Sequence, residues 1–300
     1  MLFTNKQLGN FAKDPAVVRF RDQYYLYYTI KYNHADFGAP EKIGIGISQS
    51  RDLEEWENIG ELPLEDACEK NGVGAPGAVV LEGRIHLFYQ TYGNGAKDAL
   101  CHAVSEDGLH FTKDKTNPVY HPEATWCCGR AIDADVCVFK GKLLLYYATR
   151  DHAMRVQMIG GAYAPLNSDF SHNCWKPLAN EPLLSPELDW EGECIEAPAV
   201  IENRGRLFLF YGGAYNCSPQ QVGCAVSDDG IHFTRLSSQP FLPNGVAGEW
   251  NSCESGHPYI FRDNDGRTYL FYQGSADGGK TFYLSKKEIW FDADNLPRLK

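Results

Sequence analysis

A repeat with a period of about 60 residues is the feature that most constrains this chain. Five runs share one pattern, an apolar strand followed by a short turn and an aromatic strand, as in DPAVVRFRDQYYLYY and APAVIENRGRLFLFY. The runs begin at positions 14, 75, 133, 197 and 257, so successive starts lie 61, 58, 64 and 60 residues apart. Such regular spacing predicts one structural unit repeated five times.

Each unit has the pattern of β structure. Long stretches with the 3.6-residue apolar period of a helix are absent, and the runs are rich in aromatic and β-branched residues. Four of the five are followed by a third strand-like segment and a polar turn that ends in an aromatic residue, such as SEDGLHF or SDDGIHF. About four antiparallel strands per unit predict an all-β fold, a five-bladed β-propeller that forms a single domain over residues 1–300. A two-sheet sandwich does not predict equal intervals.

The composition narrows the class of partner. Hydrophobic residues make up 43% of the chain, which is enough for a packed core, and no apolar run approaches the roughly 20 residues of a membrane span. The net charge of −11 disfavours nucleic acid and anionic membranes. We therefore expect a small, neutral partner, with no nucleic acid and no membrane.

The start of the chain and its cysteines bear on localisation. The segment MLFTNKQLGNFAKD lacks the basic flank and apolar stretch of a secretory signal, and the ten cysteines include no CxxC pair. We expect reduced thiols in a cytoplasmic protein; removal of a signal peptide ahead of residue 1 would instead indicate a secreted or periplasmic protein.

Candidate catalytic residues lie where the inner strands begin. In a blade, the innermost strand starts at the face where the second strand ends, so residues at these positions converge. The residues that open the five inner strands are Asp14, Ala75, Asp133, the Glu196–Ala197 pair and His257. Several carboxylates in one small pocket raise the pKa of at least one of them, and glycosidic bond cleavage needs one ionised and one protonated carboxyl group. We therefore predict a catalytic pocket on the axis.

Neighbouring acids compete for two of these positions. Asp135 follows Asp133 by two residues, and strand alternation puts both on the same side, so only the repeat alignment favours Asp133. Glu191 and Glu193 lie close to Glu196 in the segment WEGECIEAP.

Substrate-binding candidates come from the connectors between blades. Trp126, Trp190 and Trp250 lie six or seven residues ahead of inner-strand starts, where indole faces could stack on a sugar ring; packing between blades is the alternative for each. Polar candidates for binding sugar hydroxyls or supporting a carboxylate are His34, Arg130, Arg150, His152 and Tyr215.

The ordered motifs resemble glycoside hydrolase family 43, which is related to families 32 and 68; all are five-bladed propellers with acids on the axis. The resemblance covers essentially the whole chain. The matching positions are Asp14-Pro15, Ala75-Pro76, Ile132-Asp133, Glu196-Ala197-Pro198 and His257.

The resemblance implies an inverting glycosidase that cleaves terminal pentose-type glycosides, either α-L-arabinofuranosides or β-D-xylosides. Asp14 would be the general base, Glu196 the general acid, and Asp133 the residue that orients the acid and keeps its pKa high. In family 43 the residue at the position of His257 often binds water or a calcium ion on the axis, so a metal is compatible with the chain but not required.

Departures from the family pattern leave alternatives open. Ala134 stands where family 43 usually has proline, and both Arg130 and the Glu193-Cys194 pair resemble family 32, whose members are retaining fructosidases. A propeller phosphorylase of the mannoside type is another alternative, because Arg130, Arg150, His152 and Arg155 could bind phosphate. A non-catalytic carbohydrate-binding propeller is the alternative outside the enzymes.

Overall fold

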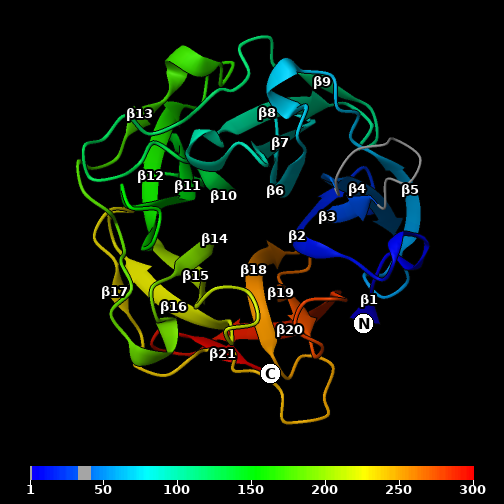
Figure 1. The fold of residues 1–300 in the computed structure, drawn as a ribbon, viewed down its shortest axis with the longest axis vertical. Helices are drawn as coiled ribbons and strands as arrows, with labels where there is room; N and C mark the ends of the chain where they lie inside the picture. Colours follow the sequence, from blue (N-terminus) through cyan, green and yellow to red (C-terminus); the bar gives the residue numbers. More distant parts are fainter. Residues whose placement is uncertain (1, 33–41) are drawn as a thin grey trace.

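The strands of this protein form five antiparallel sheets that stand in a ring around a central axis (Figure 1). The computed structural model describes residues 2–32 and 42–300. Four of the sheets contain four strands that pair in chain order from the axis outward, and the fifth contains five strands. The predicted five-bladed β-propeller is therefore confirmed. Within the described chain, no helix is long and apolar enough to cross a membrane.

The two strands nearest the axis in each blade correspond to the repeated runs of the sequence. The innermost strands are β2 (Lys13–Phe20), β6 (Val73–Leu81), β10 (Ile132–Phe139), β14 (Ile195–Asn203) and β18 (Glu254–Arg262). The second strands are β3 (Gln23–Tyr32), β7 (Arg84–Thr91), β11 (Lys142–Arg150), β15 (Arg206–Gly213) and β19 (Thr268–Ser275).

The outer part of each blade is shorter and more exposed. The third strands are β4 (Lys42–Ser50), β8 (Leu100–Ser105), β12 (Gln157–Pro165), β16 (Gln221–Ser227) and β20 (Tyr283–Phe291). The fourth strands of the first four blades are β5 (Glu57–Glu61), β9 (Phe111–Lys113), β13 (Lys176–Pro177) and β17 (Thr234–Arg235). Short 3-10 helices lie between strands: η1 (Lys6–Leu8), η3 (Ala67–Glu69), η4 (Gly95–Lys97), η5 (His172–Cys174) and η6 (Asp189–Glu191).

Both ends of the chain complete the fifth blade. The N-terminal strand β1 (Leu2–Phe3) pairs antiparallel with β20, and so does the C-terminal strand β21 (Pro297–Leu299), farther along the same strand. The ring is therefore closed by hydrogen bonds between segments from opposite ends of the sequence, which removes an open sheet edge.

Buried tyrosines on the second strands tie adjacent blades together. Tyr27 and Tyr146 are fully buried, and their hydroxyls donate to the backbone carbonyls of Gly108 (3.0 Å) and Gly230 (2.9 Å) in the following blades. These side chains fill the space between sheets with apolar area while satisfying their one polar group, which is the condition for burying tyrosine without a penalty.

The same β-bulge interrupts all five inner strands near their start. At each bulge one residue adopts a left-handed backbone conformation, with φ of 52° at Asp14, 44° at Ala75, 55° at Asp133, 51° at Ala197 and 45° at His257. A non-glycine residue rarely adopts this conformation, and strain of this kind is concentrated at functional sites. The bulge also shifts the alternation of side chains that follows it.

Side chains from the preceding blade satisfy the backbone N–H of four of these five bulge residues. Each bond crosses from one blade to the next, and the first blade follows the fifth. The pairs are Asp14 with Gln273 Oε1 (2.9 Å), Ala75 with Thr29 Oγ1 (2.8 Å), Asp133 with Gln90 Oε1 (2.7 Å) and His257 with Gln220 Oε1 (3.1 Å). The bulges are therefore held in position by the ring itself.

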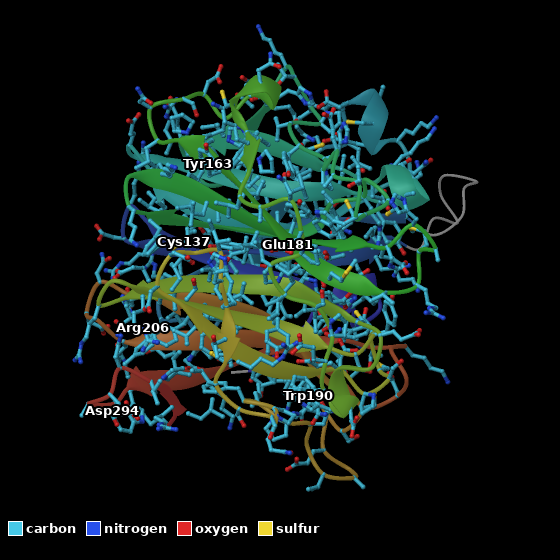
Figure 2. The ribbon with its side chains drawn as sticks, turned by 90° about the vertical axis from the view of Figure 1, so that its left-hand side faces the viewer. Cys137, Tyr163, Glu181, Trp190, Arg206 and Asp294 are labelled. Atoms are coloured by element: carbon cyan, nitrogen blue, oxygen red, sulfur yellow. The ribbon has the colours of Figure 1, made fainter. Side chains whose placement is uncertain are left out.

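Blade connectors and hairpin turns lie toward opposite faces of the ring. In the side view, Arg206 beside the β14–β15 turn lies toward one face, and Trp190 in the connector before β14 lies nearer the other (Figure 2).

Candidate active site

A cavity of about 390 Å³ opens on the propeller axis where the inner strands begin. It is lined by Asp14, Asp133, Glu196 and His257 from four different blades, together with residues at the ends of the second strands. The size lies within the range of small-molecule sites. The structure thus brings together the four polar residues that the repeat alignment singled out.

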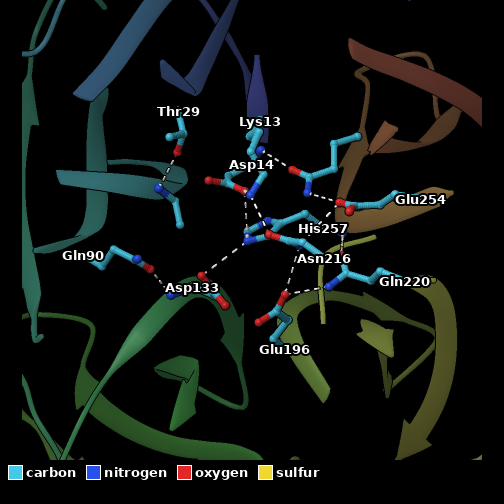
Figure 3. Close-up of polar contacts among 12 residues, drawn as sticks. Lys13, Asp14, Thr29, Gln90, Asp133, Glu196, Asn216, Gln220, Glu254 and His257 are labelled. Carbon is cyan, nitrogen blue, oxygen red and sulfur yellow. Dashed lines mark hydrogen bonds and ion pairs between the residues drawn. The ribbon is translucent and has the colours of Figure 1, made fainter. Parts of the chain in front are cut away.

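His257 lies between two of the acids (Figure 3). Its Nε2 is 3.2 Å from Oδ1 of Asp14 and 3.3 Å from Oδ1 of Asp133. Burial by itself lowers the pKa of His257, but the two carboxylates outweigh it and raise that pKa to about 9. Burial likewise opposes ionisation of Asp133, yet the charge of His257 holds the Asp133 pKa below its usual range. At neutral pH this arrangement contains an imidazolium beside an ionised Asp133.

Glu196 has the opposite electrostatic character. It stands one residue before the left-handed position of its blade, and its side chain is buried. Two effects raise the pKa of Glu196 to about 7: burial, which is the larger, and the negative charge of Asp133. Three amide groups donate to its carboxyl oxygens: Gln220 Nε2 (2.6 Å), Asn216 Nδ2 (3.3 Å) and Gln157 Nε2. The site therefore contains one carboxyl group kept ionised and another that retains its proton near neutral pH.

Lys13 and Asn216 link Asp14 to Glu196. Lys13 Nζ lies 3.8 Å from Oδ1 of Asp14 and donates to Oδ1 of Asn216 at 2.8 Å. Asn216 in turn donates to Glu196, so these contacts link the Asp14 side of the pocket to the Glu196 side (Figure 3). Burial lowers the pKa of Lys13, but Asp14 and the other nearby acids outweigh it and raise that pKa, so this side chain is a cation.

A further buried carboxylate, Glu254, supports the pocket from behind. It accepts the backbone N–H of Cys217 at 2.7 Å, the Nδ2 of Asn216 at 3.4 Å and the side-chain amide of Gln273. Because Gln273 also holds the N–H of Asp14, Glu254 positions both Asn216 and the first inner strand.

Our sequence reasoning missed the supporting residues Lys13, Gln157, Asn216, Gln220 and Glu254. A signal for two of them was present: Gln157 begins one third strand and Gln220 directly precedes the next, so amides occupy similar places in adjacent blades. The other three carry no repeat signal.

The structure also decides between the competing acids. Asp135 accepts the backbone N–H of Val200 in the next blade (2.7 Å) and does not line the cavity. The expectation that Asp133 and Asp135 share one side of the strand is wrong, because the bulge between them breaks the alternation. Glu191 is fully buried against Arg235, and Glu193 is exposed.

The structure places only some of the predicted polar binding residues at the cavity. Arg130, Arg150 and Tyr215 line the cavity. His152 is exposed outside that lining, where its Nε2 lies 2.8 Å from the carbonyl of Thr125. His34 lies outside the described residues.

The three connector tryptophans lie outside the lining of the axial cavity. Trp190 stacks on Tyr211 with ring centroids 6.1 Å apart and donates its Nε1 to the Ser238 carbonyl at 3.1 Å. It also covers Gly213 so closely that an added Cβ would lie 2.2 Å from the indole. Such contacts match packing against the second strand of its blade rather than an exposed sugar platform.

Of the other two tryptophans, Trp250 packs as Trp190 does, whereas Trp126 lines a different cavity. Trp250 covers Gly274 in the same way and packs against Tyr272 with ring centroids 5.7 Å apart. Trp126 lines a separate cavity of about 470 Å³ together with Tyr120.

The sequence matches the profile of Glycosyl hydrolases family 43 over residues 3–290. The chain belongs to this family. The resemblance expected from Asp14, Asp133, Glu196 and His257 is thereby confirmed for the chain as a whole.

Individual relatives of this family 43 chain are distant. A beta-1,2-mannobiose phosphorylase of Thermoanaerobacter sp. (strain X514) is 33% identical over 112 residues, which cover 32% of this chain and 36% of that protein. The match therefore spans about a third of that relative. A thermostable family-43 glycoside hydrolase superposes with a TM-score of 0.76 at 22% identity over 99% of this chain and 96% of its own. An alpha-L-arabinofuranosidase from Lactobacillus brevis superposes with a TM-score of 0.71 at 16% identity, covering 99% and 97%.

The axial residues of this family 43 chain do not fit a calcium cage. Calcium prefers six to eight oxygen ligands, whereas here a ring nitrogen of His257 makes direct contacts with both carboxylates. Among the described residues, no group of three or more His, Cys, Asp or Glu side chains is arranged to hold a metal ion.

Proposed function

We propose that this chain hydrolyses terminal pentose-type glycosides, α-L-arabinofuranosides or β-D-xylosides, with inversion at the anomeric carbon. The observation that carries the proposal is the division of charge in one pocket. Glu196 has a pKa of about 7, while Asp133, whose pKa is depressed, and Asp14 both contact the His257 imidazolium. A general acid and a general base with these properties are the requirement for single-displacement hydrolysis.

In the proposed reaction, Asp14 accepts a proton from a water molecule whose oxygen attacks the anomeric carbon. Glu196 donates its proton to the glycosidic oxygen as the bond between that oxygen and the anomeric carbon breaks. The products are the free sugar with inverted configuration and the released alcohol. Glu196 is then a carboxylate and Asp14 is protonated, so exchange of one proton with solvent restores both groups.

The remaining residues of the pocket set these protonation states. Asp133 raises the pKa of Glu196 through its negative charge and thereby keeps the acid protonated near pH 7. His257 contacts Asp14 and Asp133 directly, and its positive charge lowers the pKa of Glu196 less than the charge of Asp133 raises it.

The pentose assignment is supported by the fold shared with the Lactobacillus brevis alpha-L-arabinofuranosidase and by the modest size of the cavity. A pocket of this size suits one terminal sugar, which favours exo-action on short glycosides.

A panel of p-nitrophenyl furanosides and pyranosides tests the reaction, and proton NMR of the first product identifies its anomer. We expect release from at least one pentoside, with inverted product. Glu196→Gln should lower kcat strongly for an alkyl glycoside and much less for a p-nitrophenyl glycoside, because only the poor leaving group needs protonation. Glu193→Gln, an exposed neighbour, serves as the control. Equal losses on both substrates would contradict the role of Glu196.

Phosphorolysis is a second candidate function. It is favoured by the 33% identity to a beta-1,2-mannobiose phosphorylase and by the two arginines that line the pocket. In that reaction a phosphate oxygen replaces water as the attacking atom. Repeating the panel with and without inorganic phosphate distinguishes the two, since only phosphorolysis yields a sugar 1-phosphate.

A further inference from the structure

Two guanidinium groups lie side by side in the wall of the axial cavity. Arg130 Nη1 and Arg150 Nε both donate to the same oxygen, Gln157 Oε1, at 3.4 and 2.6 Å. Both side chains line the cavity that contains the three acids. Two like charges held this close repel each other, so the arrangement is costly unless an anion offsets it.

These arginines are incompletely paired within the described chain. Arg150 makes its other hydrogen bond to the Met154 carbonyl (3.3 Å) and lies over the Tyr215 ring, with no carboxylate partner among the described residues. Arg130 is 9% exposed and has a loose contact with Asp98 at 3.6 Å, while its buried Nε has no hydrogen-bond partner. Unsatisfied buried donors of charged groups are rare because they are destabilising.

Elsewhere in this chain, buried cations are matched to carboxylates. Arg235 forms two hydrogen bonds of 2.8 Å to fully buried Glu191, and Lys113 lies 2.5 Å from fully buried Glu69. Arg150 departs from this pattern, because its hydrogen bonds go to an amide oxygen and a backbone carbonyl, and Arg130 has only the longer ion pair with Asp98 at 3.6 Å. The two arginines therefore have less carboxylate charge beside them than the other buried cations, which indicates that a ligand supplies the rest.

The acids of the cavity do not supply that partner. Asp14 contacts Lys13 and His257, and Asp133 contacts His257. Glu196 reaches the arginines only through the amide of Gln157, which donates to it. The positive charge of Arg150 therefore remains available to a ligand, and that of Arg130 is offset only by Asp98 at 3.6 Å.

We infer that Arg130 and Arg150 form an oxyanion subsite of the axial cavity, which binds a carboxylate or phosphate group next to the general acid. Planar guanidinium forks match such groups with paired hydrogen bonds, whereas a neutral sugar hydroxyl needs only one or two donors. The oxyanion has two sources, the carboxylate of a uronosyl residue in the substrate or free inorganic phosphate. The inference rests on the proposed function of the same pocket and refines its substrate class.

Isothermal titration calorimetry tests the subsite without any turnover. Wild-type protein is titrated with inorganic phosphate, with D-glucuronate and with D-glucose, which is the uncharged analogue of glucuronate. The same titrations are run on Arg150→Gln, on Arg150→Lys and on a control, Arg206→Gln. The side chain of Arg206 is partly exposed and lies toward the opposite face (Figure 2). Thermal unfolding of each variant shows whether it is folded.

We expect phosphate or glucuronate to bind wild-type protein more tightly than glucose does. Arg150→Gln should weaken that binding roughly tenfold or more, Arg150→Lys should weaken it less, and Arg206→Gln should leave it unchanged. Binding of phosphate alone assigns the subsite to free phosphate, and preference for glucuronate over glucose assigns it to a sugar carboxylate.

The subsite is refuted if neither anion binds more tightly than glucose, or if folded Arg150→Gln binds the anion as well as wild type does. A failure of the proposed hydrolase function would look different. In that case the glycoside panel shows no release while the anion titrations still depend on Arg150.

Discussion

The charge of Asp133 should set the alkaline limb of the activity profile, and Asp133→Asn is the change that tests this. The pKa of Glu196 is raised from its ordinary 4.5 to about 7, first by burial and then by Asp133. At pH 7 a carboxyl group with a pKa of 7 is half protonated, whereas one with a pKa of 4.5 is protonated in only about one molecule in 300. The rise therefore increases the population of competent acid by about two orders of magnitude.

Asp133→Asn removes the electrostatic part of this rise and leaves the burial in place. We expect the pKa of Glu196 to fall by about one unit, which moves the alkaline limb of kcat/KM down by about one pH unit. The Asn variant also loses one anion that holds the proton of His257, but Asp14 still contacts that ring at 3.2 Å.

The assay is kcat/KM against pH, from pH 5 to 9, on a glycoside with a poor leaving group. Asp135→Asn is the matched control, because Asp135 lies two residues along the same strand, is buried and does not line the cavity. An alkaline limb that stays in place in a folded Asp133→Asn protein, or that moves equally in both variants, would refute the assignment of Asp133 as the group that keeps Glu196 protonated.

Three further predictions concern stability and packing. Glu191→Gln should lower the free energy of unfolding by about 3 kcal/mol, because it removes the buried counter-charge of Arg235 and leaves only the exposed Glu187 beside it. Asp228→Asn at the exposed pair with Arg206 should cost less than about 1 kcal/mol, and equal losses of the two variants in urea unfolding would contradict the distinction. Trp190→Ala should lower stability by about 3 kcal/mol and leave KM within about twofold of wild type, since the indole packs on Tyr211; a large rise in KM without loss of stability would restore the sugar-platform interpretation. Burial, with a smaller effect of His102, lowers the pKa of His86 to about 4. The contribution of neutral His86 to folding stability is therefore fully present above the unfolded pKa of 6.5 and is lost as the pH falls toward 4. The contribution of His86 to the unfolding free energy should therefore fall by about 2 kcal/mol between pH 7 and 5. The difference in unfolding free energy between wild type and His86→Gln at the two pH values measures it, and a difference that does not change with pH would show that His86 is not responsible.

The architecture and the position of the axial acids could be predicted from the sequence. Equal spacing of five strand pairs defines the blades, because hydrogen bonding within each blade is local. Once the blades are known, Asp14, Asp133 and His257 must meet, since every inner strand begins at the same face. Neither inference needs contacts between distant segments.

Closure of the ring and the chemistry of the site were decided by tertiary structure. The pairing of β1 with β20 joins Leu2 to Ser285, from opposite ends of the chain, and no local sequence pattern indicates it. Asp133 rather than Asp135 faces the cavity because of the bulge between Ile132 and Asp135, in which the backbone N–H of Asp133 donates to Gln90 of the neighbouring blade.

Protonation states depend on the same kind of distant contact. The pKa of Glu196 depends on burial and on Asp133, which lies in another blade, and the amides that hold Glu196 come from loops and third strands. Trp190 and Trp250 likewise acquire their packing role from the glycines that they cover. Sequence period determines which residues arrive at the axis, whereas burial and neighbouring charges, which exist only after the blades assemble, determine what those residues can do.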